Sequence, residues 1–541
     1  MVRKMKKNKV AFITCVNNEE LYKKSLSYIN KLKIPEDIEI EFIAMRNSKS
    51  IASAYNETIQ KSDSKYKVYL HQDVYIQNTN FVEDILSIFN SNQDIGLIGV
   101  VGAKVIPVSG VWWEDPCRVG KVFDSHRGSM ELLSFNEFSE PYTDVKGIDG
   151  LIMITQYDIK WRDDLFDGWH FYDLSQSTEF IQKGFKVVVP NQKIPWCIHD
   201  CGYVNTANGF EEYKNIYLDN YSKYIFPLVS ILIPAYNQTN YLKKALDSAL
   251  NQSYRNTEII ICDDSTTNDV QKFVEGYKLK TNKIKYINNG GPSGQRGKVN
   301  LGKCLSASCG EYINFLLHDD VFKLNKLDRM MNYFLYDNTL TLITSYRKMI
   351  NDKDEYLNDN FRTVRQYPYD IRLTGEEAGR KILFSMINYI GELSTAIFKR
   401  DAIDSDLTKH SIIDYDSNEI YCLGDISLWL KLLRKGNMIY IAEPLSNLRI
   451  HNSQNTQDKI LTFWAAIDFF NIIISSYESK AFIRTRDELL IILRKWFKEY
   501  SNFLTSFSEE FNNKSEKNRE IIILKEEYIR CYTKFINILF E

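Results

Sequence analysis

The sequence predicts an α/β protein with two tandem domains, each built on a mostly parallel β-sheet covered by helices, and a C-terminal α-helical tail. Three observations lead to this prediction. Short β-branched segments alternate with segments whose apolar residues recur at helical spacing, a pattern typical of parallel sheets with helices on both faces. The opening of this pattern occurs twice in the 541 residues. From about residue 456 onward glycine and proline disappear, and apolar residues recur between lysine and glutamate as in amphipathic helices.

Each domain is expected to open with the same elements. The first, over residues 9–225, starts with a strand at 10–14 that leads through a polar turn into a helix. The second, over residues 227–455, starts with a strand at 229–235 and continues in the same way. Pro227 stops the helical stretch before it, so the junction is expected there.

The tail over residues 456–541 is expected to be helical without carrying a chemical motif. Phe463, Ile467, Phe470 and Ile474 recur at helical spacing and form an apolar stripe. Water would not leave such a stripe exposed in a stable monomer. The tail is therefore expected either to pack on the second domain or to form a surface for homo-oligomerisation.

Composition and charge fit an ordinary globular protein and exclude several classes of function. The 68 lysines and arginines nearly balance the 70 aspartates and glutamates, which gives a net charge of −2. This balance provides no general attraction to a polyanion, so no nucleic-acid partner is expected. With 44% hydrophobic residues, the chain can bury a core in each of about two to four domains.

Cysteine usage and the apolar segments indicate a cytoplasmic protein. Nine scattered cysteines do not form a disulfide framework and fit free thiols in a reducing compartment. The basic N-terminus precedes an apolar segment too short for a signal peptide, and it is a candidate for peripheral contact with anionic lipid at the inner face of the membrane. The apolar run at 461–474 is interrupted by Asp468 and falls short of the roughly 20 residues that a membrane span needs.

Later landmarks indicate that the two domains arose by duplication. His71-Gln-Asp-Val74 in the first domain matches His318-Asp-Asp-Val321 in the second. Asp173 and Asp425 are separated by 252 residues, and so are His199 and His451. Repeated motifs that also keep their spacing are the signature of an internal repeat.

Acidic residues follow two strands of the second domain. Asp263 and Asp264 follow an apolar strand at 258–261, and Asp319 and Asp320 follow another at 312–317. The carboxyl ends of parallel strands meet at one edge of the sheet, where ligands bind. Adjacent carboxylates repel each other unless a cation is present, and a hard divalent ion coordinated by oxygen would also hold substrate phosphates. The sequence therefore predicts a divalent metal, Mn²⁺ or Mg²⁺, and a nucleotide at this edge.

Two common phosphate-binding motifs are excluded. The segment at 290–298 is rich in glycine, but Pro292 stands where a P-loop has its first glycine and Val299 replaces the required serine or threonine. A Gly-x-Gly-x-x-Gly motif after an opening strand is also missing, so a dinucleotide site is not supported. A nucleoside diphosphate site built on carboxylates and a metal remains.

Four segments of the second domain, taken together, resemble a known family. They are Ser230-Ile-Leu-Ile-Pro-Ala-Tyr-Asn237, Asp263-Asp-Ser-Thr266, Ala307-Ser-Cys-Gly-Glu-Tyr-Ile313 before His318-Asp-Asp320, and Leu423-Gly-Asp425-Ile-Ser-Leu-Trp429. This set resembles the inverting family 2 glycosyltransferases, over about 220 residues. The resemblance implies a GT-A fold, which is Rossmann-like, and transfer of a sugar from a nucleoside diphosphate to an acceptor.

The resemblance implies a donor pocket in the second domain. Pro234 and Tyr236 would line the nucleoside pocket, where Asp264 would read the uracil or thymine edge. Arg296 would assist there, and Asp319 would contact the ribose. The donor would therefore be a uridine- or thymidine-diphosphate sugar.

The resemblance also implies the catalytic groups. Asp320 would hold the metal, with His451 near the diphosphate in the closing segment, and Asp425 would be the general base. Acceptor attack in line with departure of the nucleoside diphosphate needs a base on the acceptor side and positive charge on the leaving side. Asp425 as a simple helix cap is the alternative to the catalytic interpretation.

The first domain resembles a divergent branch of the same family. Asp73 and His199 would then serve the metal, and Asp173 would be the base. The acidic turn after the second strand is replaced by Met45-Arg46-Asn-Ser-Lys-Ser-Ile51. Arg46 and Asn56 must therefore supply what Asp264 supplies in the second domain, if the pocket binds a nucleotide.

Two further patterns in the first domain allow alternative interpretations. Cys197-Ile-His199-Asp-Cys201 suggests zinc, although no second ligand pair with zinc spacing accompanies it. Trp112 and Trp113, like Trp161 and Trp169, could stack on a sugar or belong to the core.

Three functions are compatible with the sequence. The first is a bifunctional glycosyltransferase acting on a growing glycan, lipid-linked or protein acceptor in surface glycan synthesis. The second is a single-activity enzyme whose first domain positions the acceptor or a partner. The third is a non-catalytic carbohydrate-binding or assembly protein, and the retention of Asp73, Asp173, Asp320 and Asp425 argues against it.

Overall fold

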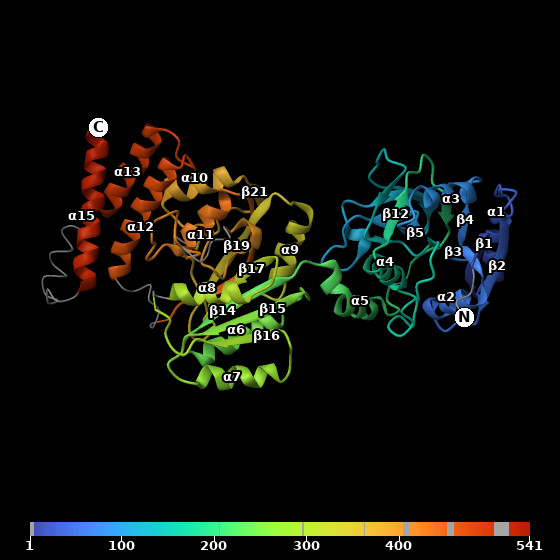
Figure 1. The fold of residues 1–541 in the computed structure, drawn as a ribbon, viewed down its shortest axis with the longest axis horizontal. Coiled ribbons are helices and arrows are strands. Elements are labelled where there is room, and N and C mark those ends of the chain that lie inside the picture. The colour runs from blue at the N-terminus through green and yellow to red at the C-terminus, as the bar shows by residue number, and fades with distance from the viewer. Residues whose placement is uncertain are drawn as a thin grey trace. The chain divides into compact units, whose positions relative to one another are not determined.

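The fold described here is a computed structural model, and Figure 1 labels many of its elements. It describes residues 5–204, 206–294, 297–361, 363–403, 411–451, 459–502 and 519–541. The chain divides into two compact units, which we call unit one (Met1–Phe226) and unit two (Pro227–Glu541).

Unit one alternates strands and helices from its first residues. Its strands are β1 (Lys6–Val16), β2 (Glu39–Arg46), β3 (Ser64–Leu70), β4 (Val74–Ile76), β5 (Ile95–Gly99), β6 (Val101–Ala103), β7 (Val119–Asp124), β8 (Glu131–Ser134), β9 (Tyr142–Asp144), β10 (Gly147–Ile148), β11 (Ile152–Thr155), β12 (Lys186–Pro190) and β13 (Cys197–His199). Its helices are α1 (Glu19–Ile29), α2 (Ile51–Lys61), α3 (Phe81–Ser91), the short 3₁₀ turn η1 (Trp112–Glu114), α4 (Tyr172–Gln182) and α5 (Phe210–Ile225).

Local sequence explains how unit one begins. The central part of β1, from Val10 to Ile13, is fully or almost fully buried, as expected of a strand covered on both faces. The Asn18 side chain accepts hydrogen bonds from two backbone N–H groups of the first turn of α1 and so caps that helix. Ser50 and Ser53 cap α2 reciprocally. Each polar turn therefore connects a strand to a capped helix that packs against the sheet.

The main sheet of unit one has the strand order β2-β1-β3-β11-β5-β12-β9. β1 pairs in parallel with β2 and β3, β11 runs antiparallel to both of its neighbours, and β12 is again parallel to β5. A second, smaller sheet has the order β10-β6-β7-β13-β4. It carries the ends of β7 and β13, and its edge strand β4 follows directly after the segment His71–Asp73.

Unit two repeats this plan and adds helices at its C-terminus. Its strands are β14 (Val229–Ala235), β15 (Thr257–Asp263), β16 (Ile284–Asn288), β17 (Tyr312–Phe315), β18 (Val321–Phe322), β19 (Leu340–Ile350), β20 (Tyr356–Leu357), β21 (Ile371–Leu373), β22 (Ile397–Lys399) and β23 (Asn437–Arg449). Its helices are α6 (Thr239–Leu250), α7 (Asp269–Lys278), α8 (Lys298–Ala307), α9 (Lys326–Tyr336), α10 (Gly375–Ser385), η3 (Arg400–Ala402), α11 (Gly424–Leu433), α12 (Lys459–Glu478), α13 (Arg486–Tyr500) and α15 (Arg519–Phe540).

The two main sheets share one topology. In unit two the order is β16-β15-β14-β17-β22-β19-β23-β18. β15, β14 and β17 are parallel, β22 runs antiparallel to β17 and β19, and β19 is parallel to β23. These are the directions found for β2, β1, β3, β11, β5 and β12, so the α/β fold class and the tandem arrangement are confirmed. The sheets are more mixed than the sequence predicts, because β11 and β22 each reverse direction inside the sheet.

The C-terminal helices belong to the core of unit two. The predicted stripe of Phe463, Ile467, Phe470 and Ile474 is buried in the same apolar cluster as Leu232 of β14 and Trp429 of α11. Of the two alternatives for the tail, packing on the second domain is therefore what the structure has. The stripe itself is covered within the chain, and homo-oligomerisation through other faces of the C-terminal helices stays a prediction.

One described helix, Ile460–Glu478, is long and apolar enough by length and composition to cross a membrane. Its most apolar stretch is 67% buried inside the structure, as in the core helix of a globular protein. Asp468 in the middle of this helix is fully buried and hydrogen-bonded to backbone N–H groups of the loop before α11.

Removal of residues 456–541 should destabilise unit two severely. The truncation deletes Trp464 and Trp496, both almost fully buried, together with their apolar neighbours. Loss of one large core side chain typically costs about 3–5 kcal/mol, and here several are lost together. We expect insoluble protein, or a soluble product with a greatly lowered melting temperature, by comparison with the full chain expressed in parallel. A soluble truncated chain would contradict this if it unfolds cooperatively near the melting temperature of the full chain and if light scattering shows no aggregates.

Candidate active sites

Asp264 lies at the carboxyl end of β15, under the glycine-rich loop. Its buried carboxylate accepts hydrogen bonds from Asn289 Nδ2 (2.6 Å), from Ser293 Oγ (2.8 Å) and from Ser293 N (3.2 Å). The carboxylate therefore holds this loop against the sheet edge. Contact with a nucleotide base at Asp264 would require the loop to share or release these bonds.

The other predicted donor-pocket residues lie near the same edge. Pro234 is the second-last residue of β14 and pairs with Cys262 of β15, and its carbonyl lies 3.2 Å from His318 Nδ1. Tyr236 follows the end of β14 and is 46% exposed. Arg296 lies outside the described residues.

Asp319 and Asp320 are held from one side by the segment that ends β23. The backbone N–H of Arg449 donates to Asp320 Oδ1 (3.0 Å), and Arg449 Nε donates to the Asp319 carbonyl (2.9 Å). His451 Nε2 lies 3.2 Å from Asp319 Oδ2. The structure thus brings His451 to Asp319 and fixes one oxygen of Asp320.

The other carboxylate oxygen of Asp320, Oδ2, is unusual because it is buried without a hydrogen-bond partner among the described residues. Burial, together with the charge of Asp319, raises the pKa of Asp320 well above its ordinary value. A buried carboxylate oxygen without a partner is costly, and a cation that binds it would relieve the cost.

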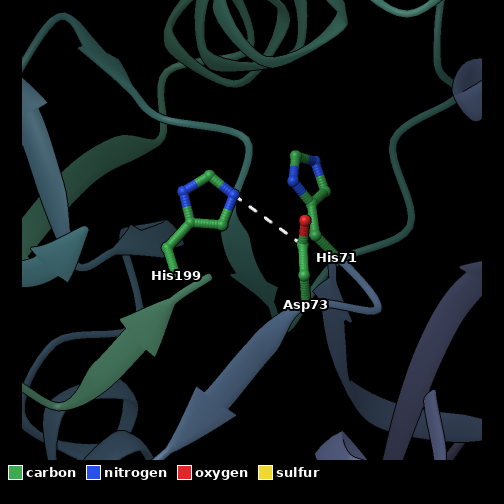
Figure 2. Close-up of side chains that lie close together, drawn as sticks. All are labelled: His71, Asp73 and His199. Atoms are coloured by element: carbon green, nitrogen blue, oxygen red, sulfur yellow. Dashed lines mark ion pairs between the residues drawn. The ribbon is translucent and has the colours of Figure 1, made fainter. Parts of the chain in front are cut away.

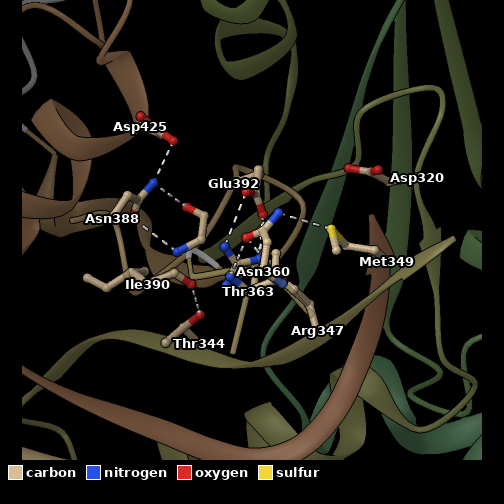
Figure 3. Close-up of polar contacts among 12 residues, drawn as sticks. Asp320, Thr344, Arg347, Met349, Asn360, Thr363, Asn388, Ile390, Glu392 and Asp425 are labelled. Atoms are coloured by element: carbon tan, nitrogen blue, oxygen red, sulfur yellow. Dashed lines mark hydrogen bonds and ion pairs between the residues drawn. The ribbon is translucent and has the colours of Figure 1, made fainter. Parts of the chain in front are cut away.

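Asp425 is the second residue of α11, with both carboxylate oxygens engaged. Its Oδ1 accepts from the N–H of Ile426 (2.8 Å) and its Oδ2 from Asn388 Nδ2 (2.6 Å), as Figure 3 shows for Asn388. Burial raises the pKa of Asp425 to about 6, to which the charge of Glu392 contributes. Glu392 itself is paired with Arg347, whose Nε lies 2.6 Å from Glu392 Oε2. Asp425 thus caps its helix in part, yet its pKa is suited to accepting a proton near neutral pH.

Unit one has a cavity of about 280 Å³ that collects the predicted catalytic residues of this unit. Its lining includes His71, Asp73, Asp149, Asp173, His199, Trp112, Trp113 and Trp169. Trp113 and Trp169 are 42% and 47% exposed, while Trp161 is buried in the core. Of the tryptophans that the sequence left open, these two are available to a ligand.

Asp173 occupies the position in α4 that Asp425 occupies in α11. Its Oδ2 accepts from Gly150 N (3.0 Å) and its Oδ1 from Leu174 N (2.8 Å). Burial raises the pKa of Asp173 to about 7, and the charge of Asp149 adds to the effect. Each unit therefore sets a second carboxylate, Asp149 or Glu392, near the candidate base.

His71, Asp73 and His199 form a candidate metal site in unit one (Figure 2). Their ligand atoms lie within 4.8 Å of one another. His199 Nε2 is 3.8 Å from Asp73 Oδ1, too far for a hydrogen bond, and this buried oxygen has no hydrogen-bond partner among the described residues. Two ligands of one ion, each about 2.1 Å from it, lie about 3.4 Å apart in tetrahedral geometry, so the two atoms are slightly farther apart than an ion would hold them.

Both histidines of this site are oriented through their other ring nitrogen. His199 Nδ1 lies 2.8 Å from Asp124 Oδ2, and His71 Nε2 lies 2.6 Å from Tyr172 Oη. Histidines that bind metals are usually held by an oxygen in this way. Asp124, His199 and Cys201 form a second group of candidate ligands, but it uses the His199 nitrogen that Asp124 already binds.

The residues predicted to replace the acidic turn have other partners. Arg46 ends β2 and is paired with Glu19, with Nε 2.6 Å from Glu19 Oε1. Asn56 is in α2, and its amide exchanges two hydrogen bonds of 2.9 Å with the backbone of Trp161. Asn56 thus anchors a loop, and reading a base would require it to break these bonds. How unit one would recognise a base stays a prediction.

Several residues of these sites were not predicted from the sequence. Asn388 and Glu392 come from the loop after α10, and Asp124 ends β7. None of them belongs to a recurring motif. Comparison of the two units is the signal that could have found Glu392, since Asp149 precedes β11 much as Glu392 precedes β22.

Comparison with known proteins agrees with this architecture. The family model described as "Glycosyltransferase like family" matches residues 11–221, and the one described as "Glycosyl transferase family 2" matches residues 230–403. Asp425 and His451 lie beyond the second match.

Two relatives and one solved structure illustrate the similarity. An uncharacterised glycosyltransferase of Rickettsia typhi is 30% identical over 234 residues, which is 42% of this chain and 66% of the relative. A UDP-Glc:α-D-GlcNAc-diphosphoundecaprenol β-1,3-glucosyltransferase of Escherichia coli is 30% identical over 210 residues, 39% of this chain and 71% of the relative. The crystal structure of S. aureus TarS 1-349 in complex with UDP-GlcNAc has a TM-score of 0.41 at 17% identity, covering 56% of this chain and 81% of that one.

Each unit is thus an α/β domain that gathers carboxylates at the ends of its sheet strands. The chain belongs to the family 2 glycosyltransferases and contains two such domains in tandem. The chain spans 66% of the length of two Rickettsia relatives and 34% of two others.

Proposed function

We propose that the protein transfers sugars from nucleoside diphosphate donors, UDP- or dTDP-linked, to hydroxyl groups of an acceptor, with inversion and with one reaction in each unit. The observation that carries the proposal is the pairing found twice in the chain. Each unit places a candidate base with a raised pKa, Asp425 or Asp173, at the start of a helix. Each also has a strand-end aspartate with a buried, unpartnered oxygen, Asp320 or Asp73.

In unit two Asp425 takes the acceptor proton. The acceptor hydroxyl approaches the carboxylate, transfers its proton to it, and attacks the anomeric carbon as the nucleoside diphosphate leaves from the opposite face. A single displacement of this kind inverts the anomeric configuration. Asn388 and the N–H of Ile426 fix the carboxylate so that it meets the hydroxyl in one orientation.

The leaving side carries the strand-end carboxylates. Asp320, with Asp319 and His451 near it, would hold a divalent cation, Mn²⁺ or Mg²⁺, in unit two, and Asp73 with His199 and His71 would do so in unit one. When bound, the cation would neutralise charge on the departing diphosphate. The unpartnered oxygens of Asp320 and Asp73 fit such an ion.

For the acceptor we propose a growing glycan carried on lipid or protein, met in the cytoplasm or at the inner face of the membrane. The printed name of the E. coli relative specifies a UDP-glucose donor and a lipid-linked acceptor, which supports this class. The half-exposed Trp113 and Trp169 in the cavity with Asp173 offer apolar faces to a sugar ring.

The second candidate function is a single activity in unit two, with unit one positioning the acceptor. It is favoured by Asn56, whose amide is engaged with the Trp161 backbone, and by the replacement of the acidic turn. A non-catalytic carbohydrate-binding protein is disfavoured because both units keep a buried candidate base with a raised pKa beside a second carboxylate.

The metal role of Asp320 is tested by nucleotide binding. In a full chain whose unit one is silenced by Asp73→Ala, Asp320→Ala should abolish the stimulation of UDP binding by Mn²⁺, measured by calorimetry. The change removes the buried oxygen that would bind the ion. Asp401→Ala, at an exposed carboxylate of the same unit, should bind like the parent. Unchanged Mn²⁺ stimulation in a folded Asp320→Ala or Asp320→Asn protein would remove Asp320 from this role.

A further inference from the structure

Asp468 of α12 holds the backbone that leads into the base-bearing helix. Its Oδ2 accepts from the N–H groups of Tyr421 (3.1 Å), Cys422 (2.6 Å) and Leu423 (3.0 Å). Leu423 is the N-cap of α11 and has no polar side chain with which to cap the helix. Asp468 therefore satisfies, from a helix more than 40 residues away, the N–H of the N-cap residue and of the two residues before it, and so fixes the segment that enters α11.

A stacked aromatic pair strengthens the same contact. The Tyr421 ring lies on that of Trp464 with centroids 3.9 Å apart and an interplanar angle of 19°. Trp464 and Asp468 are four residues apart on α12, so they share one face of the helix. Together they fix the peptide three residues before Asp425.

Helix α13 holds the other partner of the base in a comparable way. Lys495 Nζ donates to the carbonyls of Phe384 (3.0 Å) and Ser385 (2.8 Å), the last two residues of α10. These carbonyls have no partner within their helix, and a cation is favoured at a helix C-terminus. The chain then turns at Met386, in the left-handed region with φ of 56°, and reaches Asn388, which donates to Asp425.

Burying a charged group such as Asp468 is energetically unfavourable, so helix packing alone does not explain its presence. Asp468 is fully buried in an otherwise apolar part of α12, and burial raises its pKa to about 6. An apolar residue of similar volume would serve helix packing at least as well. What the carboxylate adds is a fixed position for three consecutive N–H groups.

We propose that α12 and α13 are a positioning element of the unit-two active site: Asp468 sets the approach to Asp425, and Lys495 sets the approach to Asn388. The inference rests on the proposed role of Asp425 as the base. A base must stand within hydrogen-bond reach of the hydroxyl, and a displacement of about 1 Å can cost about 10²-fold in rate. The C-terminal helices thus take part in catalysis without touching the substrate.

The test uses the full chain carrying Asp73→Ala, with Asp468→Leu and Lys495→Met as the principal variants. Leucine fills the site of Asp468 with an apolar side chain that cannot accept a hydrogen bond. Methionine has about the length of Lys495 but cannot donate one. We expect kcat for transfer to fall at least tenfold in each, with donor Kd within about twofold of the parent. Asp468→Asn keeps one acceptor oxygen, and Lys495→Arg keeps a charged donor. Each of these variants should therefore retain a higher kcat than Asp468→Leu or Lys495→Met.

The matched control is Tyr528→Phe. The Tyr528 hydroxyl donates to the Tyr500 carbonyl (2.6 Å), a partly buried bond among the C-terminal helices that touches neither loop. This variant should keep the parental kcat even if its melting temperature drops. If Tyr528→Phe lowers kcat as much as Asp468→Leu does, or if kcat and donor binding fall together in all variants, the role is structural and the proposal fails.

Hydrogen exchange gives a readout that does not depend on catalysis. Amides of residues 421–423 should exchange faster in Asp468→Leu than in the parent, and should be unchanged in Tyr528→Phe. Unchanged exchange in Asp468→Leu would overturn the anchoring step, and faster exchange with parental kcat would overturn the positioning step. If the parent transfers no sugar from any nucleotide donor, the proposed function fails, while the exchange comparison still decides whether Asp468 holds the loop.

Discussion

Asp425→Asn should lower the rate of sugar transfer by unit two by about 10²-fold or more while leaving donor affinity nearly unchanged. The amide keeps the size of the carboxyl group and can still accept from Asn388 or from the N–H of Ile426, but it cannot take a proton from the acceptor. The measurement is transfer and donor binding in the full chain with Asp73→Ala, so that only unit two contributes.

The same site predicts the direction of the pH dependence. Burial raises the pKa of Asp425 to about 6, because the charged form loses hydration. Below this pH the carboxyl group of the free enzyme is protonated and cannot act as a base, so kcat/KM should rise with pH through about 6 and then level off. Asp425→Asn should remove this limb from its residual activity.

Asp401→Asn is the control, since Asp401 is an exposed carboxylate of the same unit. It should keep the parental rate and pH profile. An equal loss of donor affinity and rate in Asp425→Asn would instead identify Asp425 as the cap of α11, the alternative that the sequence left open.

The sequence predicted the parts of the fold that are encoded locally. Strand and helix alternation, the stop at Pro227 and the apolar C-terminal tail are visible as periodicity and composition. The direction of β11 and β22 is not, because a short apolar strand has the same pattern whether its neighbours are parallel or antiparallel. The mixed character of both sheets therefore emerged only from the strand pairing.

Candidate site residues could be proposed from the sequence where they stand in motifs, and not where distant segments meet. Asp173 and Asp425 could be found because each begins a helix at a repeated spacing. Asp468 is visible in sequence only as an interruption of an apolar run, since its partners at 421–423 are distant along the chain. Asn56 is the opposite case. An asparagine can recognise a base, so the sequence suggested that role, but in the fold its amide is hydrogen-bonded to the backbone of Trp161.

Separate inactivation of the two units should remove two different sugar additions. In the full chain, Asp73→Ala should abolish one product and Asp320→Ala another, because each change deletes the strand-end oxygen on the leaving side of one site. The expectation for unit one rests on the cavity that gathers Asp73, His199 and Asp173, with the pKa of Asp173 raised to about 7. Products from one acceptor series are identified by mass, with the double variant as the inactive reference.

The comparison also decides between the two functions proposed for unit one. Asp144→Ala, at an exposed ion pair with Lys186 in the same unit, should give the full set of products and controls for general damage. If Asp73→Ala also gives the full set, unit one is a scaffold and the chain has a single activity. If both variants lose the same addition, the units contribute to one reaction. Only the loss of a distinct sugar in each variant fits two active domains, and in that case the acid limb of the Asp173-dependent addition should lie at a higher pH than that of unit two, because the second carboxylate Asp149 adds to the effect of burial on Asp173.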